Sequence, residues 1–346
     1  MQNVDVGRFA NPRGEILFEA DVRILRERVV LRLSQHPNVP CLLERRLVRS
    51  DGVTFTQILP IVDGDVLRDF MTADPYGDHL RVQYQSIDRI HREQLSSESA
   101  RRKTLTANID PLEQIGRLRT CANEAELMTI ASRILTQLGG RCYTYRWLHV
   151  DQRAGAITGQ RCLVGCQPGW VHAYIRHQWY RNDPFVDYAR RNGGPALASE
   201  IDAVGDHQWA NELADRYGFR SMLVCPAHPP SGALIGLLQV GNELQQSTGE
   251  PTLWQHRVLL RALADEILDW GIATQREEEA SLLDLDQREL TVLRLLRAGR
   301  TACNVAENLG ISERTAYVIF RKINQKLGVS HIARAVDAAT ARGLIQ

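Results

Sequence analysis

The residues best placed to do chemistry lie in the segment CQPGWVHAYIRHQWYRNDPFVDYA, at positions 166–189. Trp170 and Tyr174 are four residues apart, which puts the indole and the phenol on one face of a helix. Asp183 precedes Pro184 at an expected helix start, where its carboxylate accepts hydrogen bonds from free amides. Such groups suit a buried ligand that combines apolar bulk with amide and carbonyl groups. The same residues also occur as ordinary core and cap residues, and taken alone they favour that structural role.

Catalysis and metal binding find little support in the sequence. His172, His177 and Cys166 are the candidate reactive residues, but no arrangement of nucleophile, base and orienting group accompanies them. Among the seven cysteines, Cys162 and Cys166 form the only close pair, and no histidine pattern completes a zinc site beside them. We therefore expect neither an enzyme nor a metal or other cofactor.

A second patterned segment lies near the C-terminal end, at positions 285–329. Asp286 and Glu289 have the spacing of a capping box at a helix start. Thr301 and Ser312 are expected caps of two further helices, the first short and the second longer. A glycine ends each of the three helices, at Gly299, Gly310 and Gly328. A short helix, a glycine turn and a longer capped helix predict a helix-turn-helix.

The third of these helices has an exposed face suited to duplex DNA. Residues near its first turn are expected to reach base edges, while hydroxyls at the helix start meet phosphate oxygens. Positions 281–346 hold ten Arg and Lys against six Asp and Glu, and a surplus of cations favours nucleic acid. A solvated helix hairpin would explain the charges but not the caps and apolar spacing. The predicted DNA-binding residues are Thr301, Ser312, Arg314, Thr315, Tyr317, Val318, Arg321 and Lys322, and Lys326 is expected on the same face.

The C-terminal segment resembles the LuxR-type helix-turn-helix over about 65 residues. The family pattern begins L-T-x-R-E-x-x-V-L, continues I-A-x-x-L-x-I-S-x-x-T-V and ends K-L-G-V. The matching positions are Leu285, Arg288, Glu289, Val292, Leu293, Gly299, Ala306, Leu309, Ile311, Ser312, Thr315, Lys326, Leu327, Gly328 and Val329. Ala316, Tyr317 and Ile319 depart from the family's usual residues, which bears on sequence preference and not on DNA binding itself.

The middle of the chain resembles the autoinducer-binding domain that precedes this helix-turn-helix in quorum-sensing regulators. The family signature is a tryptophan, a tyrosine four residues later and an Asp-Pro thirteen after the tryptophan, and all of it is present here. The resemblance implies that Trp170 donates to a lactone carbonyl, that Asp183 accepts from the acyl amide and that Tyr174 is a pocket wall. It implies an acyl-homoserine lactone or a related small molecule as ligand. The expected ligand-binding residues are Tyr143, Tyr145, Trp147, Cys166, Trp170, Tyr174, Asp183 and Leu238.

Three positions differ from the family pattern in ways that reshape the expected pocket. Cys166 replaces a frequent tyrosine, Ala198 or Ser199 stands in the place of a second tryptophan, and Leu238 replaces a hydroxyl residue on the inner sheet. Fewer polar partners weaken hydrogen bonding to an acyl ligand.

Length and composition fit a protein of several domains. The 346 residues are 44% hydrophobic and 24% charged, with a net charge of +1, and these values are typical of globular chains. No apolar run has the length of a membrane span, and the first residues lack a signal-peptide core. An odd number of cysteines without a framework favours reduced thiols in a cytoplasm, and the resemblance to LuxR-type regulators implies that it is bacterial.

We predict an α+β protein of three modules. Residues 1–105 form a small α+β extension, 109–273 an α/β/α sandwich with an antiparallel sheet, and 281–346 an all-α four-helix bundle. In the extension we expect a helix at Glu15–Gln35, strands at Cys41–Val48, Val53–Val62 and His79–Tyr84, a helix from Asp63 or Asp65 to Met71, and a linker at Ser96–Lys103.

The expected elements of the sandwich follow from apolar spacing and turn residues. Helices are predicted at Pro111–Arg119, Asn123–Leu138, Gly169–Tyr180, Asp183–Arg191, His207–Tyr217 and Thr252–Ile272. Strands are predicted at Cys142–Val150, Ile157–Val164, Phe219–Ala227 and Ala233–Val240, and residues 276–284 are expected to be a linker.

Two functions are consistent with these features. The first is a transcription regulator that binds a small-molecule signal and operator DNA as a homodimer, with residues 252–272 as the dimer contact. The second is a ligand-independent regulator whose first two modules serve dimerisation and protein interaction, with RNA polymerase or another protein as partner. A polar cavity in the middle domain favours the first, and a core filled by side chains favours the second. Neither involves a membrane.

Overall fold

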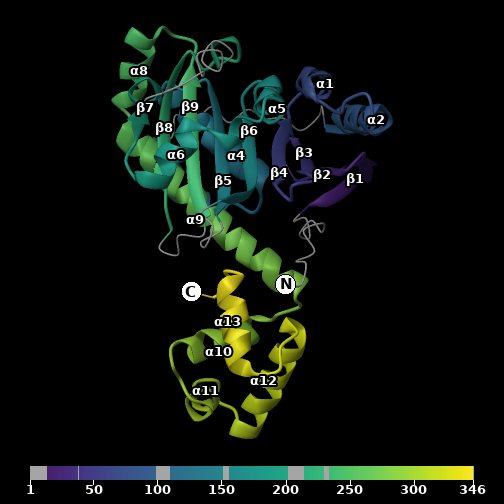
Figure 1. Cartoon of the computed structure of the whole chain (residues 1–346), viewed down its shortest axis with the longest axis vertical. Coiled ribbons are helices and arrows are strands. Elements are labelled where there is room, and N and C mark those ends of the chain that lie inside the picture. The colour runs from purple at the N-terminus through teal and green to yellow at the C-terminus, as the bar shows by residue number, and fades with distance from the viewer. Residues whose placement is uncertain are drawn as a thin grey trace. The chain divides into compact units, whose positions relative to one another are not determined.

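The computed structural model describes residues 14–37, 39–98, 110–150, 156–201, 214–229 and 234–345 (Figure 1). They form two compact units, one ending at Trp270 and the other beginning at Gly271. Among the described helices, none is both long and apolar enough to cross a membrane.

The larger unit is built on one nine-stranded mixed sheet. The strand order is β1-β2-β3-β4-β6-β5-β9-β8-β7. Neighbouring strands are antiparallel except for the parallel pair β4 and β6. The strands are β1 (Glu15–Ile24), β2 (Glu27–Gln35), β3 (Cys41–Val48), β4 (Thr54–Ile61), β5 (Cys142–Val150), β6 (Ile157–Gly165), β7 (Ala196–Leu197), β8 (Ser221–Ala227) and β9 (Leu234–Asn242).

The N-terminal strands continue the sheet of the middle domain, whereas the sequence predicted a separate unit for residues 1–105. Strand β4 pairs with β6 from Thr54 opposite Gly159 to Ile58 opposite Leu163. Residues on both sides of the expected boundary therefore belong to one compact unit. Pairing between strands so distant in the chain leaves no local sequence signal, which is why the prediction separated them. The linker predicted at Ser96–Lys103 begins inside helix α2 (Arg81–Glu98), and its other residues lie outside the described part.

Two elements of the N-terminal region were predicted wrongly. The expected helix at Glu15–Gln35 is the hairpin β1–β2, which turns at Leu25 with a φ of 56°. Val29, Leu31 and Leu33 belong to one hydrophobic core, and their spacing of two residues is the strand signal that helical spacing obscured. The expected strand at His79–Tyr84 is a turn followed by the start of α2.

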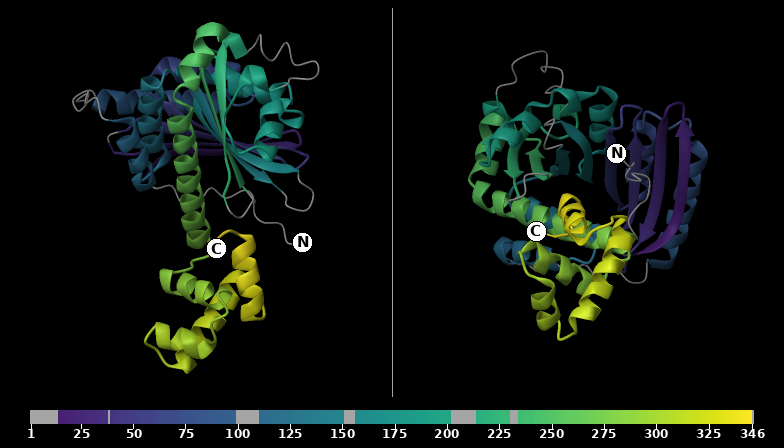
Figure 2. Two further views of the ribbon diagram at one scale, coloured as in Figure 1. Left: turned by 90° about the vertical axis from the view of Figure 1, so that its left-hand side faces the viewer. Right: turned by 60° about the horizontal axis from the view of Figure 1, so that its bottom comes forward.

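Helices cover both faces of the sheet (Figure 2). On one face lie α4 (Glu124–Gln137) and α9 (Arg257–Leu282). The Ser132 hydroxyl of α4 donates to the Tyr143 hydroxyl, and the Tyr145 hydroxyl donates to the carbonyl of Ala264 in α9. On the other lie α1 (Gly64–Ala73), α5 (Pro168–Arg176) and α6 (Pro184–Arg191). The α/β/α arrangement predicted for the middle domain is therefore confirmed.

The remaining helices match the prediction with shifted bounds. Helix α3 spans Pro111–Arg117, and the predicted Thr252–Ile272 helix is split into α8 (Gln246–Trp254) and α9. Because α9 runs to Leu282, most of the expected linker at 276–284 is helical. Of the helix predicted at His207–Tyr217, residues 214–216 are helical and 207–213 lie outside the described part.

The smaller unit is a bundle of short helices. It contains α10 (Gln287–Arg297), α11 (Ala302–Asn308), α12 (Glu313–Leu327) and α13 (Ile332–Ala341). Its core consists largely of apolar residues at helical spacing, including Leu290, Leu293, Val305, Ala316, Phe320, Ile323, Ala335 and Leu344. The predicted helix-turn-helix and its packing are confirmed.

The contact between α1 and α5 predicts how the stability of the larger unit depends on pH. The His172 ring lies 4.4 Å from the Phe70 ring, and burial lowers the pKa of His172 from 6.5 to about 3 although nearby Asp74 opposes the shift. The unfolded chain binds this proton below its pKa of 6.5, so stability is present at pH 7 and is lost as pH falls toward 3. Between pH 7 and pH 5 the loss is about 2 kcal/mol.

Between pH 7 and pH 5 we expect the unfolding free energy of His172→Gln to fall by about 2 kcal/mol less than that of the wild type, because glutamine cannot take up the proton. Urea unfolding followed by tryptophan fluorescence measures this in the larger unit, since all six tryptophans lie between residues 147 and 270. His79→Gln, which changes an exposed histidine, is the control with wild-type behaviour. Equal pH dependence in both variants would contradict the assignment.

Candidate ligand site and DNA-binding surface

A band of polar side chains crosses the sheet on the face that carries α5 and α6. The strand register aligns Gln57 with Cys162 and Cys162 with Arg146. Partners in register point to the same side of a sheet, so Arg146 and Gln57 share a face with Thr144 and its partner Gln239. All of these residues are buried.

Arg146 lies at the centre of this band. Its Nη1 donates to the Tyr174 hydroxyl at 2.7 Å and to Asp183 Oδ2 at 2.8 Å, and its Nη2 donates to Gln239 Oε1 at 2.8 Å. The guanidinium carbon also lies 4.9 Å from the centre of the Tyr174 ring. The same Gln239 oxygen accepts from the Thr144 hydroxyl at 3.1 Å. One arginine therefore joins strands β5 and β9 to helices α5 and α6.

Asp183 combines two roles. Its Oδ1 accepts from the amides of Phe185 at 2.8 Å and Val186 at 3.2 Å, which confirms the predicted cap of α6. Its Oδ2 accepts from Arg146 and, at 2.7 Å, from the Tyr174 hydroxyl. The carboxylate therefore holds the first turn of a helix and a buried cation at the same time.

The charges in this cluster are fixed by its surroundings. Burial disfavours the charged form of Arg146, but Tyr174 and Asp183 outweigh it and raise the pKa of the guanidinium. Burial also raises the pKa of the Tyr174 phenol well above 10. Arg146 is thus a cation and Tyr174 a neutral donor at physiological pH, and both donate to Asp183.

The space left inside this cluster is small. The cavity has a volume of about 20 Å³, which is enough for a single water molecule. It is lined by Phe55, Thr56, Gln57, Thr144, Arg146, Gln160, Cys162, Trp170, Val171, Tyr174, Ile175 and Gln239. Trp170 packs at ring-centre distances of 5.4 Å from both Trp179 and Phe219. Residues of β4 form part of the lining, so the N-terminal region contributes a wall that the sequence did not predict.

The structure brings together three of the eight predicted ligand-binding residues. Trp170 and Tyr174 line the cavity, and Asp183 is bonded to Tyr174 and Arg146. Cys166 is half-buried beside the hydrophobic core at the start of α5 and is not among the lining residues. The other four lie on the opposite face of the sheet and do not line the cavity, namely Tyr143, Tyr145, Trp147 and Leu238.

The strand alternation explains that separation. Tyr143 and Tyr145 face α4 and α9, and Trp147 packs 6.4 Å from Trp270, measured between ring centres. Leu238 is in register with Tyr145 and shares its face. The three β5 aromatics that were predicted to bind the ligand therefore share the face that packs against α4 and α9. The residue of β9 that faces the cavity is Gln239.

Arg146, Gln57 and Gln239 were not among the predicted ligand-binding residues. A signal for Arg146 was present, because it is a single charged residue inside the apolar strand CYTYRWLHV, and a buried charge requires a partner. Ser199, at a position considered for the second tryptophan, is held elsewhere: its hydroxyl donates to Glu250 at 2.7 Å.

A second buried arginine repeats this arrangement beside the first. Arg45 of β3 forms a two-pronged ion pair with Asp74, at 2.7 and 2.8 Å, and donates to Gln57 at 3.1 Å. Tyr84 of α2 donates to the same carboxylate at 2.5 Å. Burial raises the pKa of Asp74, but the charge of Arg45 and the hydrogen bonds from Arg45 and Tyr84 outweigh it and lower the pKa to about 2. This pair holds α1 and α2 against the N-terminal strands.

In the smaller unit the predicted helix caps are confirmed. Asp286 Oδ1 accepts from the Glu289 amide at 2.7 Å, and the Glu289 carboxylate accepts in return from the Asp286 amide at 2.9 Å. Thr301 caps α11 and Ser312 caps α12 by accepting from amides three residues on. Gly328 ends α12 with a φ of 67°.

The exposed face of α12 matches the one predicted to bind DNA. All eight predicted DNA-binding residues are exposed. Tyr317 and Val318 are apolar yet 56% and 47% exposed, and they lie among Arg314, Arg321 and Lys322. Apolar groups suited to thymine methyls thus stand beside cations suited to phosphates and guanines. Lys326, expected on this face, instead donates to Glu289 at 2.8 Å and ties α12 to α10.

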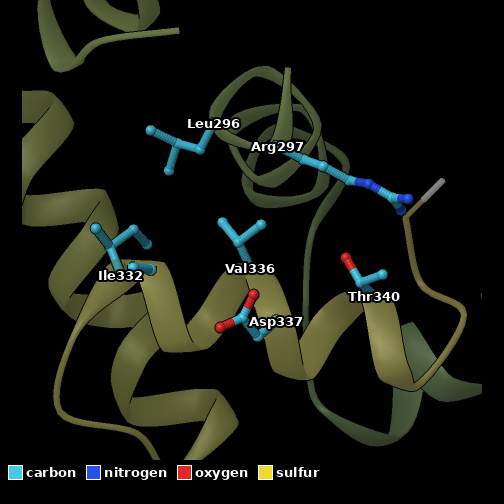
Figure 3. Close-up of a pocket in the computed structure, with 7 residues that line it drawn as sticks. Leu296, Arg297, Ile332, Val336, Asp337 and Thr340 are labelled. Atoms are coloured by element: carbon cyan, nitrogen blue, oxygen red, sulfur yellow. The ribbon is translucent and has the colours of Figure 1, made fainter. Parts of the chain in front are cut away.

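The bundle also has an open groove between α10 and α13 (Figure 3). Its volume is about 610 Å³, and Leu296, Ile332 and Val336 form its apolar part, with Arg297, Asp337 and Thr340 alongside. These residues come from helices other than α12. The groove is therefore distinct from the face that carries Tyr317 and Val318.

Together, the fold and its surfaces define a DNA-binding protein that carries a separate α+β domain with a buried polar site. Residues 123–269 match the family model of the autoinducer binding domain, and residues 284–339 match that of the bacterial regulatory proteins of the luxR family. The two matches cover more than half of the chain. The chain belongs to the LuxR family of bacterial transcription regulators and contains both an autoinducer-binding domain and a DNA-binding domain.

Individual relatives are distant. The transcriptional activator proteins AhyR of Aeromonas hydrophila and AsaR of Aeromonas salmonicida are each 23% identical over 190 residues, which are 52% of this chain and 71% of theirs. The crystal structure of Escherichia coli SdiA is 17% identical with a TM-score of 0.44 and covers 68% of this chain and 98% of its own. CepR2 of Burkholderia cenocepacia is 13% identical with a TM-score of 0.39 and covers 46% and 92%.

Because Asp183 both caps α6 and pairs with Arg146, we predict that Asp183→Asn strongly destabilises the larger unit. Asp183→Asn preserves a good cap but leaves the buried Arg146 without its counter-charge, so we expect the larger unit to lose about 3 kcal/mol of unfolding free energy. Urea unfolding followed by tryptophan fluorescence measures it. Asp187→Asn, which neutralises a 55% exposed carboxylate on the same helix, should change stability by less than about 0.5 kcal/mol. A small loss for both would show that Asp183 acts as a cap only.

Proposed function

We propose that the protein is a homodimeric regulator of transcription that binds operator DNA through α12 and receives a small-molecule signal at the site of Trp170, Tyr174 and Asp183. The observation that carries the DNA-binding part is the exposed combination of Tyr317 and Val318 with cationic side chains on a capped helix. We place the protein in a bacterial cytoplasm, where operator DNA is available, and RNA polymerase is the proposed partner in transcription.

Base reading and phosphate contact are assigned to different residues of this face. The side chains of Arg314, Tyr317 and Val318 lie on the first two turns of α12 and are proposed to meet base edges. Arg321 and Lys322 lie farther along and are proposed to contact phosphates. Thr301, Ser312 and Thr315 stand at helix starts, where hydroxyls and amides meet phosphate oxygens.

An acyl-homoserine lactone or a related small molecule is the proposed signal. The family match and the adjacency of Trp170, Tyr174 and Asp183 support it. The second candidate is a regulator that works without a ligand and uses the larger unit for dimerisation and protein contacts. The cavity of about 20 Å³ favours this alternative, because it has no space for a lactone ring and an acyl chain.

The DNA-binding surface can be tested through salt dependence. Loss of one phosphate contact reduces the magnitude of the slope of log affinity against log salt concentration by about 1. We therefore expect Arg321→Ala and Lys322→Ala each to reduce this magnitude by about 1 on duplex DNA. Tyr317→Ala should instead change which sequences are selected from a random duplex library. Fluorescence anisotropy at several salt concentrations measures the slopes.

Arg334→Ala is the matched control, since it removes one exposed positive charge from α13. An unchanged slope is expected there. If Arg321→Ala and Arg334→Ala behaved alike, overall charge rather than the α12 face would account for binding.

The proposed dimer contact is the exposed part of α9. One recognition helix reads only a few base pairs, and two copies give useful selectivity. Val258 is 71% exposed, its neighbour Leu259 is half-buried, and the half-buried Ala262 lies one helical turn farther along α9. An apolar stripe of this kind is suited to a second copy of the same helix.

We expect Val258→Asp to raise the dimer dissociation constant at least about tenfold, because it places a charge in the apolar contact. Sedimentation velocity over a range of protein concentrations measures the change. Arg261→Asp introduces the same residue at a neighbouring position that is already exposed and polar, and it serves as control. A wild-type protein that stays monomeric at saturation on DNA would overturn the proposal.

A further inference from the structure

We propose that Arg146 determines the ligand specificity of the site, because its own guanidinium occupies the position of a ligand. Its guanidinium takes the place at Asp183 that the amide N–H of an N-acyl ligand would take, so the wild-type site excludes such ligands. This inference rests on the proposed role of Trp170, Tyr174 and Asp183 as the signal site. It narrows the proposed signal, because it excludes acyl-homoserine lactones and leaves a related small molecule that places no amide N–H at Asp183.

The first argument is that Asp183 has no free acceptor capacity. A carboxylate offers about four lone-pair positions on its two oxygens. Two amides of α6 occupy Oδ1, and Arg146 and Tyr174 occupy Oδ2. A ligand amide would have to displace one of these donors.

The second argument is that Arg146 is held in place from several sides. Its backbone is in the middle of β5, paired with both β6 and β9, and its side chain is 5% exposed. Gln239 and the Tyr174 ring contact the guanidinium from two directions. Displacement would leave a buried cation without its partner, which costs more than a neutral amide hydrogen bond returns.

The third argument is the chemistry of the remaining space. The cavity of about 20 Å³ is lined by Arg146 and Gln57, and Arg146 Nε and Gln57 Nε2 are buried without a hydrogen-bond partner among the described residues. Both atoms are donors. These two atoms can be satisfied by an acceptor oxygen of a ligand or of a single water molecule, and not by an amide N–H.

Methylguanidinium added to a variant that lacks the Arg146 guanidinium tests the inference directly. Arg146→Ala leaves Asp183, Tyr174 and Gln239 around an empty guanidinium-sized site. We expect methylguanidinium at low millimolar concentration to raise the melting temperature of Arg146→Ala by about 3 °C, and to leave that of the wild type unchanged. Tryptophan fluorescence of the full chain reports on the larger unit.

Arg161→Ala is the matched control, because Arg161 is on the neighbouring strand and pairs with Glu124 at 27% side-chain exposure. No rescue is expected there. If Arg146→Ala does not fold, recovery of folded protein on refolding with methylguanidinium replaces the melting shift. Absence of rescue in either form overturns the inference.

A second arm adds N-hexanoyl-homoserine lactone to the wild type, where we expect no change in melting temperature. Stabilisation of the wild type would overturn the inference while supporting the proposed signal. Rescue by methylguanidinium without lactone binding to either protein would support the inference and remove the lactone from the proposed function. DNA binding, measured by anisotropy, reports separately on the regulator itself.

Discussion

Burial of two arginines on one face of the sheet is the constraint on which the larger unit depends. A cation inside a protein is tolerated only with a counter-charge and further hydrogen bonds. Arg45 and Arg146 meet this requirement with aspartates from the covering helices, and Gln57 lies between them. The sheet and the helices on this face are therefore matched by charge as well as by shape. Tyr174 and Asp183, which resemble a ligand site, are the partners of Arg146. This pairing explains why side chains fill the site.

Much of the smaller unit could be predicted from sequence because its signals are local. Caps, glycine ends and apolar spacing act within a few residues of one another, and the contacts of Asp286, Thr301 and Ser312 follow from them. The resemblance to LuxR-type regulators agreed with the same residues. Lys326 is the exception on the predicted face, since its partner Glu289 is on another helix and nothing near it in the sequence indicates that pairing.

The larger unit was predictable only in part because its decisive contacts are distant in the chain. The β1–β2 hairpin contains both helical and alternating apolar spacing, and only pairing with β3 resolves the ambiguity. The sequence indicated that Trp170, Tyr174 and Asp183 belong together, and they do. It did not indicate which face of β5 meets them, because alternation defines two faces without saying which helices cover each. Arg146 is a single charge in an apolar strand, but its partners come from three other elements and were not indicated.

The parallel pairing of β4 with β6 has a consequence for how the chain is made. Residues 54–58 of β4 pair with residues 159–163 of β6. The ribosome adds that segment roughly a hundred positions later. Until then the first four strands form an incomplete sheet with an open edge, which is the state most prone to pairing with other chains. The N-terminal strands thus belong to the folding unit of the ligand domain. A polypeptide that began at residue 109, where the middle domain was predicted to begin, would leave β6 as an unpaired edge strand in their place.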